Sequence, residues 1–165
     1  MLFEAAAKLK TKPNELGARI QAQLEEIREM KRAIEAYKAK ETVGEINRIL
    51  FGSHNIEGLK VITASVPNAD VGKLRQMGDV LRDKDSSIVA VLATVKEEKI
   101  TFLAVCGKDA IARGIKAGEL VKQVCSVCGG SGGGKPDSAM GGGKDMTKVD
   151  NALAIVDDFV VSKLK

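Results

Sequence analysis

The sequence predicts an α+β protein, in which a long amphipathic helix or helical hairpin precedes a globular domain with the element order β-α-β-β-α-α. Over roughly the first fifty residues, apolar side chains recur at steps of three and four, which is the period of one helix face. Farther along, they gather in short runs rich in Val and Ile, which are typical of strands. We therefore expect a helical, coiled-coil-like segment over residues 1–52 and a globular domain over residues 58–165.

The long helix is predicted from about Leu16 to Leu50, with Asn14 as its N-cap, Pro13 outside it and an interruption at Gly44. Its apolar stripe has the near-heptad spacing of helices that pack on one another. Such a stripe needs a partner, which could be a preceding helix, the C-terminal domain or a second copy of the chain. The residues predicted for dimerisation are Ile20, Leu24, Ile27, Met30, Ile34 and Tyr37.

The globular domain is predicted to begin with a strand over Leu59–Val66 and a helix over Asp70–Arg82. Ser87–Val95 is a nearly continuous apolar run, which indicates a central strand buried on both faces. The polar segment Lys96–Lys99 fits a hairpin turn, so Ile100–Cys106 should return antiparallel to that strand.

Helices are predicted to follow these strands. Asp109 can cap a short turn that runs through Arg113, and Ala117–Val127 carries its apolar residues on one side. Thr147 and Asp150 have the spacing of a capping box, in which side chains satisfy the free amides at a helix start. We therefore expect the last helix to begin near Thr147.

The stretch between these two helices, Gly129 to Asp145, reads GGSGGGKPDSAMGGGKD and holds eight of the 17 glycines. We expect a loop here, because glycine lets backbone amides approach another molecule closely. Lys135 and Lys144 each follow three glycines, so cations would lie beside amide donors, a combination suited to phosphate. The start of the last helix would add to this site. The alternative is a flexible spacer.

The overall composition favours anionic partners only mildly, since 26 basic and 22 acidic residues leave a net charge of +4. With four Phe, one Tyr and no Trp, the chain is poor in groups on which bases stack. An RNA contact would therefore be to the backbone and to shape. Besides the glycine stretch, phosphate contacts are predicted at Lys73, Arg75, Arg113, Lys116 and Lys122, and also at Arg82 and Lys84.

The three cysteines do not indicate a metal site or a catalytic function. Cys125 and Cys128 have the spacing of half a zinc site, but only Cys106 and His54 remain as further ligands, far away in the sequence. A single histidine in a polar turn also gives poor support for nucleophilic catalysis. We predict no metal, no cofactor and no catalytic residue. The odd cysteine count and the lack of a long apolar run predict a reduced, cytoplasmic compartment and no membrane partner.

A family resemblance rests on Arg113-Gly-Ile-Lys-Ala-Gly-Glu-Leu-Val-Lys-Gln-Val, followed by Gly132-Gly-Gly-Lys-Pro-Asp-Ser-Ala-Met-Gly-Gly. These residues resemble the DHHA1 domain that ends alanyl-tRNA synthetase, and the resemblance covers residues 59–164. It implies a module that contacts tRNA(Ala) at its elbow, where the D and T loops meet, and that links aminoacylation to editing. It also implies dimerisation through the preceding helix.

By this resemblance, Gly132, Gly133 and Gly134 occupy the family's glycine loop, and Lys135 stands where relatives often have Arg or His. A lysine keeps an anion contact but lacks a titratable imidazole. Met140 departs from the pattern, since a more polar residue is frequent there.

The resemblance also implies what the chain is not. It carries neither a class II synthetase catalytic region nor a zinc-binding editing motif, so we expect a non-catalytic C-terminal fragment whose partner is the rest of the synthetase. One alternative is the substrate-binding domain of a DHH-type phosphoesterase, which would need an Asp/His-rich metal domain upstream. The other is a repurposed module of the same family that binds DNA or a protein.

Overall fold

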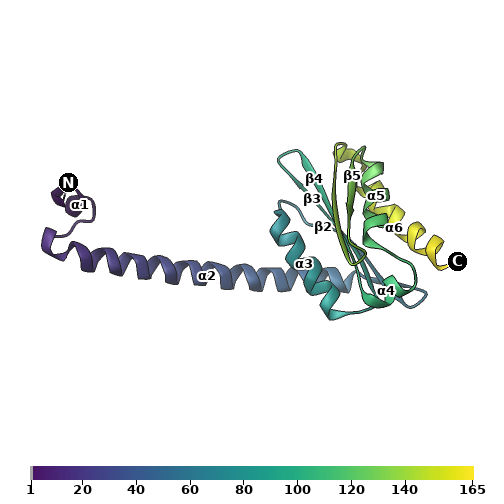
Figure 1. Ribbon diagram of the computed structural model, residues 1–165, viewed down its shortest axis with the longest axis horizontal. Helices are drawn as coiled ribbons and strands as arrows, with labels where there is room; N and C mark the ends of the chain where they lie inside the picture. Colours follow the sequence, from purple (N-terminus) through teal and green to yellow (C-terminus); the bar gives the residue numbers. More distant parts are fainter. Residues whose placement is uncertain (1) are drawn as a thin grey trace. The chain divides into compact units, whose positions relative to one another are not determined.

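The computed structural model describes residues 2–165, which divide into two compact units, one up to Val43 and one over Gly44–Lys165. The first unit contains helix α1 (Leu2–Lys8), the 3-10 turn η1 (Pro13–Glu15) and the first part of helix α2 (Leu16–Phe51). Helix α2 supplies residues to both units (Figure 1). None of the helices formed by residues 2–165 is long and apolar enough to cross a membrane.

The predicted span of the long helix is confirmed, but its predicted N-cap and its predicted interruption are not. The 3-10 turn has Lys12 as N-cap and Pro13 at its first position, where the fixed φ of proline fits, so Asn14 is no cap. Helix α2 also continues through Gly44. A glycine inside a helix costs only about 1 kcal/mol, and the next turns of α2 bury Ile46 in the second unit.

The second unit is built on a six-stranded mixed sheet with the order β1-β2-β3-β4-β6-β5 (Figure 1). Strands β2 and β3 are parallel and are joined by helix α3 (Val71–Lys84), whereas the other neighbours are antiparallel. The α+β class is therefore confirmed. The strands are β1 (His54–Ile56), β2 (Leu59–Ser65), β3 (Ile88–Lys96), β4 (Lys99–Cys106), β5 (Ser131–Gly134) and β6 (Ser138–Gly143).

One face of the sheet is covered by α3 and by the end of α2. Leu74, Met77 and Leu81 of α3 are fully buried against β3 and β4. Helix α3 lies so close to β4 that a Cβ added at Gly78 would come within 2.6 Å of Leu103 Cδ2. Asp70 is the N-cap of α3, and its carboxylate accepts a hydrogen bond from Lys73 N at 2.7 Å.

The other face of the sheet is covered by helices α5 (Ala117–Val127) and α6 (Val149–Leu164). Phe102 of the central strand β4 is fully buried in this larger core. The chain reaches these helices through α4 (Lys108–Ala112) and the 3-10 turn η2 (Met146–Lys148). The sheet thus lies between two helical layers.

Three local predictions are wrong. The stretch expected as a glycine loop forms strands β5 and β6. Thr147 and Asp150 form no capping box, because Lys148 is the N-cap of α6 and Asp145 caps the preceding turn η2, accepting a hydrogen bond from Thr147 N at 3.1 Å. Gly107 rather than Asp109 is the N-cap of α4, and Asp109 lies in its first turn.

The turn between α3 and β3 contains a carboxylate whose charge contributes to stability. The ammonium of Lys60 lies 2.7 Å from Asp85 Oδ2, and the amide and hydroxyl of Ser87 bind Asp85 Oδ1 at 2.9 and 2.7 Å. These hydrogen bonds lower the pKa of Asp85 from 3.8 to about 2. A pKa that is lower in the folded state stabilises the protein only where the carboxylate is charged.

We expect the stability from Asp85 to be present above about pH 4 and to be lost as the pH falls from about 4 to about 2. The Lys60 side chain is 40% exposed, so solvent screening limits the contribution to about 1 kcal/mol. Urea unfolding of Asp85→Asn and the original chain should differ by this amount at pH 7 and converge near pH 2. An equal difference at both pH values would contradict this assignment.

Candidate nucleic-acid interface

The glycine-rich residues form a β-hairpin at the edge of the sheet. Strand β6 pairs with the central strand β4, for example Met140 with Leu103, and β5 pairs only with β6. In the register of the hairpin, Gly132 lies opposite Gly141 and Gly133 opposite Met140. Since successive residues of a strand face opposite sides, the hairpin has two distinct glycine faces.

The face toward α5 uses glycine because the helix lies directly on the strands. A Cβ added at Gly141 would lie 2.5 Å from the Sγ of Cys125, and one added at Gly143 would lie 2.5 Å from the Cβ of Cys128. No ordinary side chain fits at such distances. Gly141 and Gly143 are therefore required for packing against α5, whereas the sequence predicted that these glycines would face a ligand.

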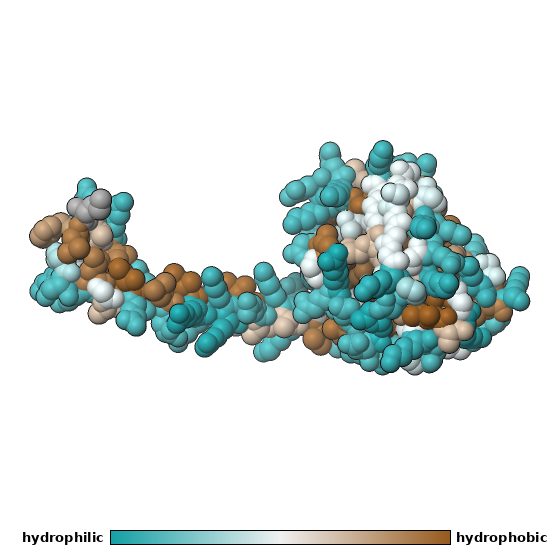
Figure 2. All heavy atoms as spheres, in the orientation of Figure 1, coloured by the Kyte–Doolittle hydropathy of each residue, from teal (hydrophilic) through white to brown (hydrophobic). Residues whose placement is uncertain are grey.

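The opposite face of the hairpin is more open. A Cβ added at Gly133 would meet its nearest atom, Lys122 Cε, at 3.9 Å, which is an ordinary contact distance. Ser131 and Gly142 share this face by alternation, as does Met140. Figure 2 shows the pale, glycine-rich strands β5 and β6 uncovered on the visible side of the second unit. This open face of β5 and β6 is a flat backbone surface with few side chains.

The two lysines of the glycine stretch lie at opposite ends of the hairpin. Lys135 is on the turn between β5 and β6, whereas Lys144 follows the last residue of β6. At about 3.4 Å per residue, the length of β6 separates them by about 20 Å. Their amides donate to Ser138 O at 3.0 Å and Cys128 O at 2.8 Å. They therefore do not form the single site of cations and free amides that the sequence predicted.

Lys116 and Lys122 lie beside the hairpin. Lys116 is the N-cap of α5, and the amide of the next residue, Ala117, donates to Pro136 O in the hairpin turn at 2.8 Å. This bond holds the start of α5 against the turn that carries Lys135. Lys122 is exposed on α5 and lies next to Gly133.

The remaining predicted cations divide into two groups. Arg75 of α3 reaches the open face of β5 and β6, where its Nε donates to the Sδ of Met140 at 3.1 Å. Lys73 is instead paired with Glu45, its Nζ 2.8 Å from Oε2. Arg113 donates to Glu57 O at 2.6 Å in the turn between β1 and β2, beside the other edge strand. The structure therefore does not bring Lys73 and Arg113 to the hairpin.

Sequence reasoning missed what holds the hairpin turn in place. Arg82 binds Asp137 in this turn at 3.0 Å and Asp79 of its own helix at 3.0 Å. Arg82 and Asp137 also line a hollow of about 490 Å³, together with Ser86 and Lys108. Arg82 and Asp137 are 55 residues apart in the sequence, so no local sequence pattern indicates that they pair.

The cysteines are free and buried. Burial raises the pKa of Cys106 to about 12 and that of Cys125 to about 11, so both thiols stay protonated at neutral pH. His54 lies at the surface, with its Nε2 2.9 Å from Asp157 Oδ1. Within residues 2–165, no three His, Cys, Asp or Glu side chains are arranged to hold a metal ion.

Several known proteins resemble this chain. A model described as the DHHA1 domain matches residues 58–162. The alanine–tRNA ligase of Bacillus thuringiensis (strain Al Hakam) is 40% identical over 165 residues, all of this chain and 19% of the ligase. That of Geobacillus kaustophilus (strain HTA426) is 40% identical over 162 residues, 98% of this chain and 18% of the ligase. The chain thus spans about a fifth of the length of these relatives.

The fold has counterparts among solved structures. The C-Ala domain of Aquifex aeolicus alanyl-tRNA synthetase superposes with a TM-score of 0.61 at 28% identity, covering 66% of this chain and 96% of that domain. A DHH domain from a member of the s1p family of ribosomal proteins gives a TM-score of 0.53 at 15% identity, covering 86% of this chain and 34% of that one. The second similarity concerns the fold alone.

Proposed function

Because the chain belongs to the DHHA1 domain family, we propose that it is the tRNA-binding and oligomerisation module of an alanyl-tRNA synthetase. In this proposal the second unit contacts the elbow of tRNA(Ala) and thereby links aminoacylation to editing. The module itself is non-catalytic, and its further partner is the rest of the synthetase in the cytoplasm. The similarity to ligases along the whole chain supports this assignment.

The proposal of tRNA binding rests mainly on the open face of β5 and β6. Its glycines leave room for an RNA backbone to approach the main chain closely. Arg75, Lys122, Lys135 and Lys144 surround it, and none of the three lysines has an ion-pair partner among residues 2–165. Cations around a flat surface suit a folded RNA that is recognised by its backbone and shape.

The test is fluorescence anisotropy with tRNA(Ala) and its isolated acceptor minihelix across a salt series. We expect clearly tighter binding of the full tRNA, because only it contains the elbow. We also expect the binding of tRNA to persist in an excess of duplex DNA, because charge attraction alone would not distinguish tRNA from DNA. Equal binding of tRNA and minihelix, or displacement by DNA, would favour the repurposed module that binds DNA or another partner.

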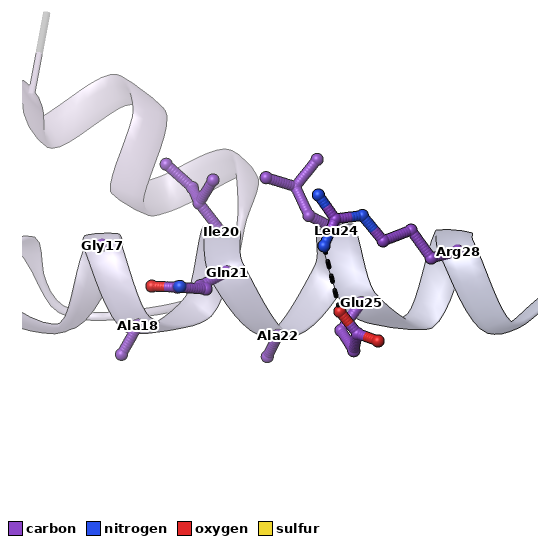
Figure 3. Close-up of a pocket in the computed structure, with 8 residues that line it drawn as sticks. All are labelled: Gly17, Ala18, Ile20, Gln21, Ala22, Leu24, Glu25 and Arg28. Carbon is purple, nitrogen blue, oxygen red and sulfur yellow. Dashed lines mark hydrogen bonds and ion pairs between the residues drawn. The ribbon is translucent and has the colours of Figure 1, made fainter.

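The first unit supports the oligomerisation part of the proposal. Its predicted apolar stripe is exposed, and Leu24, for example, is 52% exposed. Ile20 and Leu24 point to the same side of α2, whereas Ala18 and Ala22 point to the other (Figure 3). A helical stripe with near-heptad spacing fits the same stripe of a second copy.

We expect Leu24→Lys to weaken dimerisation by about 100-fold, since each of two buried leucines contributes about 1.5 kcal/mol or more. Ala22→Lys is the matched control, because Ala22 lies on the opposite side of the helix. Sedimentation equilibrium measures both dissociation constants. An original chain that is monomeric at high concentration, or equal effects of the two variants, would contradict dimerisation through this stripe.

A further inference from the structure

A cluster of lysines lies at the tip of the sheet, at the far end of the hairpin from Lys135. Lys96 and Lys99 face each other across the two-residue turn between β3 and β4, whose residues Glu97 and Glu98 have φ values of 50° and 61°. Directly opposed residues of an antiparallel pair project from the same face, with Cβ atoms about 5 Å apart. Lys96 and Lys99 therefore project side by side from one face of the sheet.

A third lysine joins them through the next strand. Ile100 of β4 pairs with Gly143, the last residue of β6, so Lys144 follows at the same end of the sheet, where its amide donates to Cys128 O at 2.8 Å. All three lysines are exposed. Within the described residues, none of them forms an ion pair, not even with Glu97 or Glu98. Like charges placed opposite each other destabilise a sheet unless an anion compensates them.

The tip lysines lie on the same side of the sheet as the open face of β5 and β6. Ile100 is buried in the core under α5 and α6, so its neighbours Lys99 and Thr101 project to the opposite side. There, Lys96, Lys99 and Thr101 line a hollow of about 270 Å³ beside the start of α3. Two carboxylates also line this hollow, Glu97 of the turn and Asp70, whose carboxylate is already bonded to Lys73 N at 2.7 Å.

We propose that Lys96, Lys99 and Lys144 bind a backbone phosphate of the RNA. This proposal rests on the proposed function and extends it to Lys96 and Lys99, which the sequence indicated only as a turn. Neighbouring strands are about 4.8 Å apart, so the three ammonium groups can converge on one phosphate group. The RNA backbone would then run along the hairpin, from this tip to Lys135 about 20 Å away.

The test compares Lys96→Ala/Lys99→Ala with Lys38→Ala/Lys40→Ala, which removes the same charge from exposed positions of α2. Anisotropy with tRNA(Ala) across a salt series measures both affinity and the salt slope. Each phosphate contact contributes about 0.7 to 0.9 to that slope. We expect the first variant to lower the slope by about 0.7 to 0.9, the loss of one phosphate contact, and the affinity by about tenfold, and the control to leave the slope unchanged.

Two further comparisons sharpen the result. Lys96→Arg/Lys99→Arg keeps both charges and should bind like the original chain, which separates loss of charge from a folding defect. Inorganic phosphate should compete no better than chloride at equal ionic strength; stronger competition would assign the cluster to free phosphate instead. If the original chain binds no tRNA, the proposed function fails; if it binds and Lys96→Ala/Lys99→Ala binds equally well, only this inference is overturned.

Discussion

Replacing Gly130 by Ala should lower the free energy of unfolding by about 3 kcal/mol, the upper end of typical overpacking costs. A Cβ at this position would overlap the carbonyl oxygen of Gly142 and lie 2.7 Å from the Cα of Gly143. Both are main-chain atoms of β6, so no side chain can rotate to relieve the contact. The hairpin would have to move away from α5. Urea denaturation, followed by circular dichroism, measures the change.

Gly133→Ala is the matched control for this prediction. The nearest atom to the added Cβ is the Cε of Lys122, the far part of a flexible side chain, at 3.9 Å. The free energy of unfolding should therefore change by less than about 0.5 kcal/mol, as is usual for surface substitutions. Equal losses in Gly130→Ala and Gly133→Ala would mean that flexibility, rather than close packing, explains the glycines of this hairpin.

The triple variant Arg75→Ala/Lys135→Ala/Lys144→Ala should bind tRNA(Ala) about 100-fold to 1,000-fold more weakly than the original chain. Each of the three cations borders the open face of β5 and β6, and a charge-assisted contact contributes about 1 to 1.5 kcal/mol here. Lys135→Ala alone should cost about 1 kcal/mol. Anisotropy at moderate salt gives each dissociation constant, and the salt slope should fall with each contact removed.

A second triple variant controls for net charge. Lys73, Lys84 and Arg113 are held by Glu45, Asn47 and Glu57, away from the hairpin. Their replacement by Ala removes the same three charges, yet the effect on affinity should be small, because interactions beyond about 8 Å are largely screened at physiological salt. A loss as large as that of the first triple variant would show that binding depends on charge alone.

Much of the fold could be predicted from apolar patterns. The continuous run over Ser87–Val95 does form most of β3, which is buried from Ile88 to Thr94, and Ala117–Val127 matches helix α5. Lys96–Lys99 does form the turn between β3 and β4. The resemblance to the DHHA1 domain, which rested on the glycine stretch and the residues after Arg113, is confirmed.

The glycine strands could not be predicted in this way. Glycine has low strand propensity and no side chain, so β5 and β6 carry no alternating apolar pattern. Their strand structure comes from pairing with β4 and from close packing under α5, both of which depend on residues far away in sequence. For the same reason, Lys135 and Lys144 looked like one site, although a strand of six residues separates them.

The most direct test of the central claim is to follow the backbone amide NMR signals of the labelled chain as tRNA(Ala) is added. The account predicts that the largest shifts fall on the open face of β5 and β6, at Ser131, Gly133 and Gly142, and on the tip lysines Lys96 and Lys99. Shifts confined to the edge strand β1 or to the turn that binds Arg113 would contradict it, since the RNA would then contact the opposite edge of the sheet.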